Sequence, residues 1–383
     1  MDNIAGNRTR LSWAVNISVL ALVVLWVVPT LGLFVSSFRT ADQIATSGWW
    51  KALLPSEQNL VLRTADPDEA RVLRDGVYVV EGNLFADTAP ATISSWGVSS
   101  RAVDAYAPGE TATLRDGATI TVAANGDYLW QGDAEQISGR GQRVFATATM
   151  PPVFTLDNYR KVLFSGDSTD SMAKAFFNTL TVTIPATIIP IAFAAFAAYA
   201  LAWMDFPGRG LLIAFVVALL VVPLQLALIP LLKLHLDIGI GKGYLGTWAA
   251  HTGFGLPLAI YLLRNYMVGL PRDIIENARV DGATDFQIFT RIILPLSFPA
   301  LASFAIFQFL WVWNDLLVAK VFLIDATGET TVMTNQIVEL LGTRGGNWEI
   351  LATAAFVSIA VPLVVFFTMQ RYLVRGLLAG SVK

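Results

Sequence analysis

The polar stretch ENARVDGATDFQIFTRIILP, residues 276–295, lies between long runs of almost purely apolar residues. It contains three acidic residues and two arginines. The whole chain has 383 residues, of which 55% are apolar and only 14% are charged. This composition is too apolar for an ordinary soluble domain, so we expect a polytopic membrane protein in which the polar stretch is a loop between spans.

Crossing the hydrocarbon core takes about 20 mainly apolar residues, because a helix rises about 1.5 Å per residue. The first apolar core, from Trp13 to Phe34, is longer than that of a signal peptide and is followed by no small-residue cleavage site, so we interpret it as a span. We also expect Pro223 and Pro230 to kink the third span. The sequence predicts an all-α polytopic membrane protein with six transmembrane helices, near residues 13–36, 177–203, 211–233, 244–268, 294–318 and 350–372.

Arginine and lysine in short loops set the orientation, because cationic flanks are retained in the cytoplasm. An even number of spans places both termini on one side. With cytoplasmic termini, that side receives Arg8, Arg10, Arg209, Arg264, Arg272, Arg279, Arg291, Arg371, Arg375 and Lys383. The opposite short loops hold Lys233, Lys242, Lys320 and Arg344. The polar stretch is therefore predicted to be cytoplasmic.

The predicted organisation has four parts: residues 1–38, the N-terminus and first helix; 39–170, an extracytoplasmic β-rich insert; 171–372, a five-helix core with a cytoplasmic loop at 270–290; and 373–383, a cytoplasmic tail.

β-branched and aromatic runs indicate the strands of the insert: VYVV at 77–80, and TITVAANGDYLW at 119–130 with an Asn125-Gly126 turn suited to a two-residue hairpin. LRDG occurs at 73–76 and at 114–117, which favours two Asp-Gly hairpin turns over a true repeat. A structural or docking role for the insert is preferred to sugar binding.

The polar stretch reads as a helix, a glycine corner and a second helix. Ile274, Ile275 and Ala278 share one face of the first helix. Gly282 ends it, since glycine adopts the left-handed cap conformation at low cost. Thr284 and Gln287 have the spacing of a capping box, and they begin a helix with an apolar stripe of Phe286, Phe289, Ile292 and Ile293.

Such an amphipathic pair could rest on lipid headgroups. Helices at a membrane surface usually carry lysine and arginine, whereas this segment carries Asp273, Glu276, Asp281 and Asp285, which face anionic lipid unfavourably. A protein partner fits the charges better.

Polar residues inside spans are costly and invite functional interpretation. They include Gln225, Gln308, Asn314 and Asp315. Gln308, Trp311 and Asn314 fall on one face of a helix and combine hydrogen-bonding groups with an aromatic ring, which suits a sugar. We favour the alternative that they only join helices, because polar side chains in membrane bundles commonly do so.

The sequence offers no catalytic or metal site of its own. GIGKGY at 239–244 lacks the leading glycine and the final hydroxyl of a phosphate-binding loop. His235 and His251 are the only histidines, and no acidic cluster is predicted around either. The chain has no cysteine, and a net charge of -3 without a basic stripe argues against nucleic acid.

The spaced motif Glu276-Asn277-Ala278, Gly282, and Ile292-x-Leu294-Pro295 resembles the EAA loop of binding-protein-dependent ABC importer permeases. LPRDIIENARVDGAT through WVWND, NTL, AAYALA and the tail RYLVRGLLAGSVK resemble the carbohydrate-uptake branch, in particular its maltose and alpha-glucoside type. The resemblance covers most of residues 154–383. Asn277 replaces the second alanine of the motif, and the long insert exceeds the compact family pattern but is similar to alpha-glucoside permeases with extended outer segments.

The resemblance implies a non-catalytic permease subunit in a bacterial cytoplasmic (inner) membrane. Its partners would be membrane lipid, a second permease, two ATPase subunits and an extracytoplasmic sugar-binding protein. ATP and Mg²⁺ would be bound by the ATPases, and no cofactor by this chain. The alternatives are a permease for a non-sugar solute, a membrane-anchored sensor or a glycosyltransferase. The last two would need an output domain or a carboxylate or metal site that the sequence does not show.

The resemblance also assigns the coupling residues. Ile274, Ile275 and Ala278 would enter a groove of the ATPase, while Glu276 and Asp281 would pair with its cations or cap local amides. Gly282 would set the corner, and Leu294 with Pro295 would complete the motif. The tail 371–383 resembles the segment that reaches between two ATPase subunits, with a solvated tail as the alternative. In this family type the other permease holds most of the sugar, which lowers Gln225, Gln308, Trp311 and Asn314 as ligands.

Overall fold

The computed structural model describes residues 8–86, 90–164, 171–324, 326–343 and 346–378. It divides into two compact units, Met1–Asn158 with Asn347–Thr353, and Tyr159–Gly346 with Ala354–Lys383. The predicted tail at 379–383 lies outside the described residues.

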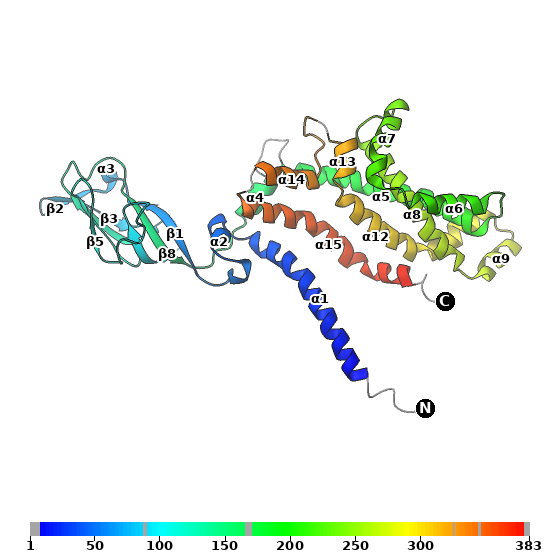
Figure 1. Ribbon diagram of the computed structural model, residues 1–383, viewed down its shortest axis with the longest axis horizontal. Coiled ribbons are helices and arrows are strands. Elements are labelled where there is room, and N and C mark those ends of the chain that lie inside the picture. Colours follow the sequence, from blue (N-terminus) through cyan, green and yellow to red (C-terminus); the bar gives the residue numbers. More distant parts are fainter. Residues whose placement is uncertain (1–7, 87–89, 165–170, 325, 344–345, 379–383) are drawn as a thin grey trace. The chain divides into compact units, whose positions relative to one another are not determined.

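The first unit combines one long helix with a β-rich part (Figure 1). Within the described residues, its strands form a three-stranded sheet in the order β1-β8-β4 and a five-stranded sheet in the order β2-β3-β7-β6-β5. Every strand pair within these sheets is antiparallel. The elements are α1 (Arg8–Ser36), α2 (Ala41–Thr46), the 3₁₀ turn η1 (Trp49–Lys51), β1 (Ser56–Arg63), α3 (Pro67–Ala70), β2 (Val72–Arg74), β3 (Val77–Asn83), β4 (Thr92–Gly97), β5 (Thr111–Thr113), β6 (Thr119–Val122), β7 (Asp127–Gly132) and β8 (Arg143–Met150).

The predicted β-rich character of the insert is confirmed, and its turns follow the local sequence. Asp75 and Gly76 both have positive φ, 51° and 85°, which is the two-residue type I′ hairpin turn expected for Asp-Gly. The prediction that Asn125-Gly126 forms a two-residue hairpin turn was wrong. The Ala123 amide donates to the Asp127 carbonyl at 2.8 Å, so three residues form the loop, and only Gly126 among them has positive φ, 88°. Asn125 does not have a positive φ there, so Gly126 is the residue of the loop that takes the left-handed conformation.

The β-rich part has its own apolar core. Trp96 is fully buried, its indole N–H donates to the Ala107 carbonyl at 3.1 Å, and its ring lies 5.1 Å from the ring of Tyr106. Side chains from both sheets complete this core, including Ile93, Ile120, Trp130 and Val144. Alternation along each strand explains the burial, because every second side chain faces inward.

The end of α1 is tied to later segments of the same unit. The Asn158 side-chain amide donates to the carbonyls of Ser37 and Arg39 at 2.9 and 2.8 Å. The Thr353 hydroxyl lies 3.2 Å from the same Ser37 carbonyl. The rest of α1 is apolar on all sides and largely unpacked, as expected of a helix made for a lipid environment.

The second unit is helical. Helices α5 and α8 pack along each other, and α12 packs on both (Figure 1). Small residues at the contacts, such as Ala194, Ala198 and Ala259, are fully buried and allow the backbones to approach closely. The elements are α4 (Asp157–Phe164), α5 (Met172–Trp203), α6 (Arg209–Leu219), α7 (Leu224–Asp237), α8 (Tyr244–Val268), α9 (Arg272–Val280), α10 (Asp285–Ile288), the π-helical turn η2 (Phe289–Ile293), α11 (Leu294–Leu296), α12 (Phe298–Trp313), α13 (Leu317–Phe322), α14 (Met333–Thr343) and α15 (Trp348–Leu378).

Three helices of the described chain are long and apolar enough to cross a membrane: Leu11–Ser36, Met172–Trp203 and Trp348–Tyr372. Two bent helix pairs raise the number to as many as five. α8 coincides with the predicted span 244–268 but carries polar residues such as Thr247 and His251, and it does not reach the same hydropathy. The count of six spans is therefore not established by the helices themselves.

Two predicted spans are broken rather than continuous. The third, 211–233, consists of α6 and α7, which meet at 109°. Pro223 stands at the start of α7 and makes the break, whereas Pro230 lies inside the helix. The fifth, 294–318, is shorter than predicted, because α12 ends at Trp313. The segment Asp285–Leu296 and helix α12 meet at a bend of 69°. Pro223 accounts for the first corner, and Ser297, which is not helical, accounts for the second.

Candidate functional site

The helix–glycine–helix predicted in the polar stretch is present. Helix α9 ends at Val280, and Gly282 follows with φ of 80°. The Ala283 amide donates to the Ala278 carbonyl and the Gly282 amide to the Arg279 carbonyl, both at 3.0 Å. This pair of bonds is a complete Schellman motif, which satisfies carbonyls that the helix end leaves free. Nothing lies within 4 Å of a Cβ built on Gly282, so its backbone conformation alone requires glycine.

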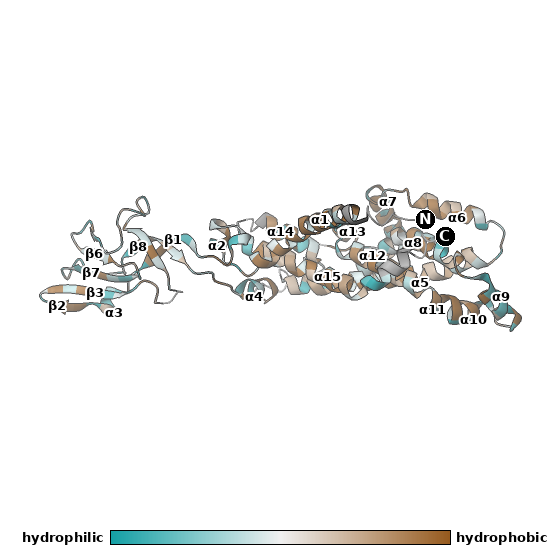
Figure 2. Ribbon diagram, turned by 90° about the horizontal axis from the view of Figure 1, so that it is seen from below, coloured by the Kyte–Doolittle hydropathy of each residue, from teal (hydrophilic) through white to brown (hydrophobic). Residues whose placement is uncertain are grey.

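The second helix begins with the predicted capping box. The Gln287 amide donates to the Thr284 hydroxyl at 3.3 Å, and the Thr284 amide donates to the Gln287 side-chain oxygen at 2.9 Å. The two bonds satisfy donors at the helix start. After one turn the backbone widens into the π-helical turn η2, which the sequence did not indicate. Figure 2 shows hydrophilic α9 next to hydrophobic α10 and α11.

Burial divides the predicted coupling residues into two groups. Ile275 is only 2% exposed and belongs to the core that this chain forms itself, so its predicted place in a partner's groove is wrong for this structure. Ala278 packs against the same core. The helix face that holds both residues is turned inward because it anchors α9 to the bundle. The large apolar side chains that point outward are Ile274, Val280 and Phe286, which are 38%, 87% and 66% exposed.

An ion pair that the sequence analysis missed fixes the two helices to the end of α5. The Arg279 guanidinium lies 3.3 Å from an oxygen of Asp285, and the Tyr199 hydroxyl donates to the same oxygen at 3.3 Å. Arg279 also approaches the Trp203 carbonyl at 3.5 Å. The six-residue spacing of Arg279 and Asp285 hides this pair from a helical-face argument, because the glycine corner brings them together.

Glu276 and Asp281, by contrast, are exposed, and neither forms an ion pair with any residue of the described chain. Leu294 is half-buried against the core, while Pro295 is exposed within α11. The motif therefore presents two unpaired carboxylates and three apolar side chains on one short polar segment. Their role in contacting a partner stays a prediction.

The residues predicted for a substrate path are not brought together. Gln308 is 1% exposed, and its side-chain amide donates to the Ala186 carbonyl at 3.1 Å and to the His251 carbonyl at 3.4 Å. It thus joins α12 to α5 and α8. Asn314 donates to the Leu310 carbonyl of its own helix at 2.8 Å, and Gln225 is exposed near the start of α7.

Trp311, the fourth predicted path residue, faces a cavity of about 430 Å³. The cavity lies between the broken pair α6–α7 and the helices α8 and α12. Its lining is otherwise apolar or glycine: Leu219, Leu220, Val222, Leu224, Ala227, Leu231, Gly253, Phe254, Pro257 and Leu258. It offers an aromatic ring and aliphatic surface but no polar side chain beyond the indole.

Among the described residues, a single acid lies near His251. The imidazole Nε2 lies 3.8 Å from Oδ2 of Asp315, and both side chains are almost completely buried. His235 instead packs on Phe322, with ring centroids 5.2 Å apart. Within the described residues, no group of three or more potential metal ligands occurs.

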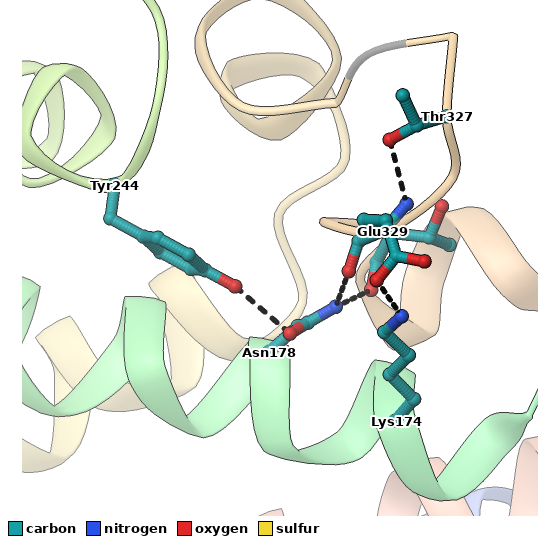
Figure 3. Close-up of polar contacts among 6 residues, drawn as sticks. Lys174, Asn178, Tyr244, Thr327 and Glu329 are labelled. Carbon is teal, nitrogen blue, oxygen red and sulfur yellow. Dashed lines mark hydrogen bonds and ion pairs between the residues drawn. The ribbon is translucent and has the colours of Figure 1, made fainter. Parts of the chain in front are cut away.

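A polar network also joins α5, α8 and the loop before α14 (Figure 3). The Asn178 side chain accepts from the Tyr244 hydroxyl at 2.9 Å and donates to the carbonyls of Glu329 and Thr331, each at 2.9 Å. Lys174 forms an ion pair with Glu329. The sequence contains no local signal for this network, since the three segments that it joins lie more than sixty residues apart.

A helical bundle with several helices long and apolar enough to cross a membrane defines a polytopic membrane protein, and here the bundle carries a short, exposed polar helix pair. The family model described as "Binding-protein-dependent transport system inner membrane component" matches residues 190–378. The alpha-glucoside transport system permease protein AglG of Rhizobium meliloti (strain 1021) is 60% identical over 381 residues, which are 98% of each chain. This chain belongs to the family of binding-protein-dependent transport system inner membrane components.

A second relative is similar over a shorter region. The osmoprotective compounds uptake permease protein GgtD of Synechocystis sp. is 58% identical over 230 residues, which are 60% of this chain and 76% of that protein. Among solved structures, a bacterial ABC transporter involved in the import of the acidic polysaccharide alginate aligns with a TM-score of 0.48 at 24% identity, covering 58% of this chain and 81% of the other.

Proposed function

We propose that this chain is one membrane-spanning subunit of an ATP-driven, binding-protein-dependent importer for an alpha-glucoside-type oligosaccharide. The observation that carries the proposal is the 60% identity to an alpha-glucoside permease over 98% of both chains. At that coverage the alignment includes the β-rich insert as well as the helical unit. The chain supplies a pathway and a contact surface, while ATP hydrolysis belongs to partner subunits.

In this proposal the chain crosses the membrane six times with both termini in the cytoplasm. α1, α5 and α15 are three of the spans, the two bent pairs are two more, and α8 is the sixth. The distribution of arginine and lysine supports the orientation. The insert then lies on the extracytoplasmic side, where a binding protein delivers the solute.

The segment α9–α10 is the proposed contact with an ATPase subunit. Its three outward apolar residues, Ile274, Val280 and Phe286, would enter the partner's surface, and Glu276 and Asp281 would meet cations there. Ile275 and Ala278 transmit the movement, because they join α9 to the core of the bundle. The complete assembly would contain a second permease, two ATPases that bind ATP and Mg²⁺, and an extracytoplasmic binding protein.

A second candidate function is uptake of an osmoprotective compound. The osmoprotective compounds uptake permease protein GgtD is 58% identical to this chain, but the match covers only 60% of this chain. The first candidate is preferred because the alpha-glucoside relative matches along nearly the whole chain.

The substrate class is tested with the reconstituted complex of two permeases, two ATPases and the binding protein. ATPase activity is measured with binding protein loaded with maltose, trehalose, sucrose or glycine betaine. We expect stimulation by alpha-glucosides and none by glycine betaine. The reverse pattern would replace the first candidate with the second.

Reversing the charge of Glu276 tests the contact segment. Loss of a paired carboxylate at a partly buried interface costs about 2–5 kcal/mol, so Glu276→Lys should abolish both co-purification of the ATPase and sugar uptake. If the segment rested on lipid instead, an added lysine would gain about 1 kcal/mol near anionic headgroups and transport would be normal. Glu57→Lys, at an exposed position of β1, is the control for a general effect of charge reversal.

A further inference from the structure

The interior of the helical unit contains a buried acid and a buried imidazole that face each other. His251 belongs to α8, and Asp315 lies in the short break between α12 and α13. Their side chains are 2% and 7% exposed. Charged groups at such depth in a membrane protein are expensive, and they usually have a partner or a function.

Asp315 is held firmly by its own neighbourhood. One carboxylate oxygen, Oδ2, accepts the Ala319 amide at 3.1 Å, at the start of α13. The backbone carbonyl of Asp315 accepts the Thr334 hydroxyl of α14 at 2.7 Å. The acid therefore moves only together with the short helices α13 and α14.

The imidazole of His251, in contrast, has an unused group. Its Nε2 is buried and has no hydrogen-bond partner among the described residues. The distance of 3.8 Å to Oδ2 of Asp315 is too long for a hydrogen bond, for which about 2.7–2.9 Å is usual between charged groups. A relative movement of about 1 Å between α8 and the α12–α13 break would close it.

Two nearby polar side chains bond across helices. Gln308 donates to two carbonyls across three helices, and the Trp313 indole donates to the Ser358 carbonyl at 2.9 Å. Unlike these donors, the ring nitrogen of His251 faces a carboxylate oxygen at a distance that leaves no hydrogen bond. An acceptor and a ring nitrogen that face each other without bonding instead match a contact made in another arrangement of the helices.

We propose that His251 and Asp315 are the two halves of an interior latch, open in the arrangement described here and closed by a hydrogen bond in another state of the transport cycle. This inference rests on the proposed transport function. Both residues are positioning residues: they hold α8 against the break between α12 and α13 and contact no solute. Closing the latch gives the moving helices a second energy minimum, which alternating access requires.

The latch is tested by His251→Phe combined with Asp315→Asn in the reconstituted complex, because phenylalanine keeps a ring at position 251 but can neither donate nor accept the hydrogen bond. Replacing both members of a buried pair avoids leaving one charge unpaired, so folding and membrane abundance should remain normal. Loss of one charge-assisted hydrogen bond in one state should lower the uptake rate about tenfold, the factor that corresponds to about 1.4 kcal/mol. Thr252→Val, which removes another buried hydroxyl without a partner from α8, is the matched control and should transport normally.

Normal uptake by the double variant overturns the latch, as does an equal loss in Thr252→Val. If the double variant fails to insert, His251→Phe alone decides, because it removes the ring nitrogen while Asp315 still accepts the Ala319 amide. Reduced uptake at normal abundance then supports the latch, and normal uptake refutes it.

A distance measurement tests the latch independently of which solute the complex transports. The chain has no cysteine, so spin labels on single cysteines at Leu245 of α8 and Leu317 of α13 report only the introduced sites. Both positions are exposed, at 60% and 45%. We expect two distances during ATP turnover in the otherwise native chain and one in the double variant. A single distance in both refutes the latch, whereas failure of every alpha-glucoside to stimulate the ATPase refutes only the proposed substrate.

Discussion

The two units of this chain differ in which apolar side chains they bury. The β-rich part places large side chains inside, including Trp96 and Trp130. The helical unit buries small residues where its helices meet, such as Ala194, along with large ones such as Phe304, and it leaves others, such as Phe193, more than half exposed. The difference follows from the solvent: water rewards the removal of apolar area, whereas lipid does not, so membrane helices associate through close backbone approach.

Polar groups follow the same division. In the β-rich part, ion pairs such as Arg74–Glu81 are on the surface, at 2.6 Å. In the helical unit, polar side chains such as Gln308 are buried and bridge helices, and both members of the His251–Asp315 pair are almost completely buried. Polar side chains with a functional role are therefore expected inside the helical unit, whereas those of the β-rich part are expected to contribute to stability.

The largest expected effect comes from truncating the β core. Trp96→Ala should destabilise the β-rich part by about 3–5 kcal/mol, because it removes a fully buried side chain and leaves a cavity. Trp50→Ala, at a tryptophan that is 71% exposed, should change stability by less than about 0.5 kcal/mol. Proteolysis of the purified protein in increasing urea, read from cleavage within residues 56–150, measures both. Equal effects would mean that this part does not rely on a water-type core.

The next test enlarges a small residue in the helical interior. Ala194→Leu should cost about 1–3 kcal/mol, since the fully buried alanine packs in the core where α5 and α8 meet and the substitution adds three carbon atoms. Ala192→Leu, two residues away on the exposed side of α5, should be nearly neutral. Thermal unfolding in detergent compares them. A tolerated Ala194→Leu would show that close approach of the backbones is not what stabilises the unit.

A smaller effect is expected at the corner of the contact segment. Gly282→Ala should cost about 1 kcal/mol, because alanine is strained at φ of 80° although space is free. Gly208→Ala meets the same strain at φ of 82°, also with nothing near the added carbon, and controls for it. Both variants should lose similar stability, but only Gly282→Ala should lower ATPase co-purification and sugar uptake. Equal transport by the two variants would show that the corner at Gly282 has no role in coupling.

The sequence predicted most of what depends on local chemistry. Gly282 and the Thr284–Gln287 capping box are as expected, because caps depend on a few adjacent residues. The Asp75-Gly76 turn and the β-rich insert were likewise predictable from short patterns. The apolar helices were found from their length and hydropathy, and a kink at Pro223 was expected, whereas the break at Ser297 was not.

Features that depend on distant contacts were not predictable in the same way. The face of α9 was correctly identified as apolar, but periodicity cannot tell whether that face meets a partner or the chain's own core, and Ile275 meets the core. Asp315 and His251 are 64 positions apart in the sequence, so their approach follows only from helix packing. The same holds for the Asn178 network.

The smallest expected effect lies on the surface of the β-rich part and concerns Asp127. Its carboxylate accepts hydrogen bonds from the side-chain amides of Asn83 at 2.8 Å and Asn125 at 2.6 Å. These bonds, with that of Asn83 the stronger influence, hold the pKa of Asp127 below its ordinary value. The ionised form is therefore favoured by folding.

The sign of the pH dependence follows from this direction. A carboxylate whose folded pKa is depressed contributes stability above its unfolded pKa, near 4, and loses that contribution as the pH falls through the folded pKa. Asp127→Asn should lower the melting temperature of the β-rich part slightly at pH 7, and the difference from the native chain should be lost as the pH falls through the folded pKa of Asp127. Because the carboxylate is exposed, the shift should be the smallest of those proposed here. A difference that persists unchanged at low pH would assign the effect to the shape of the Asn125 turn rather than to the charge of Asp127.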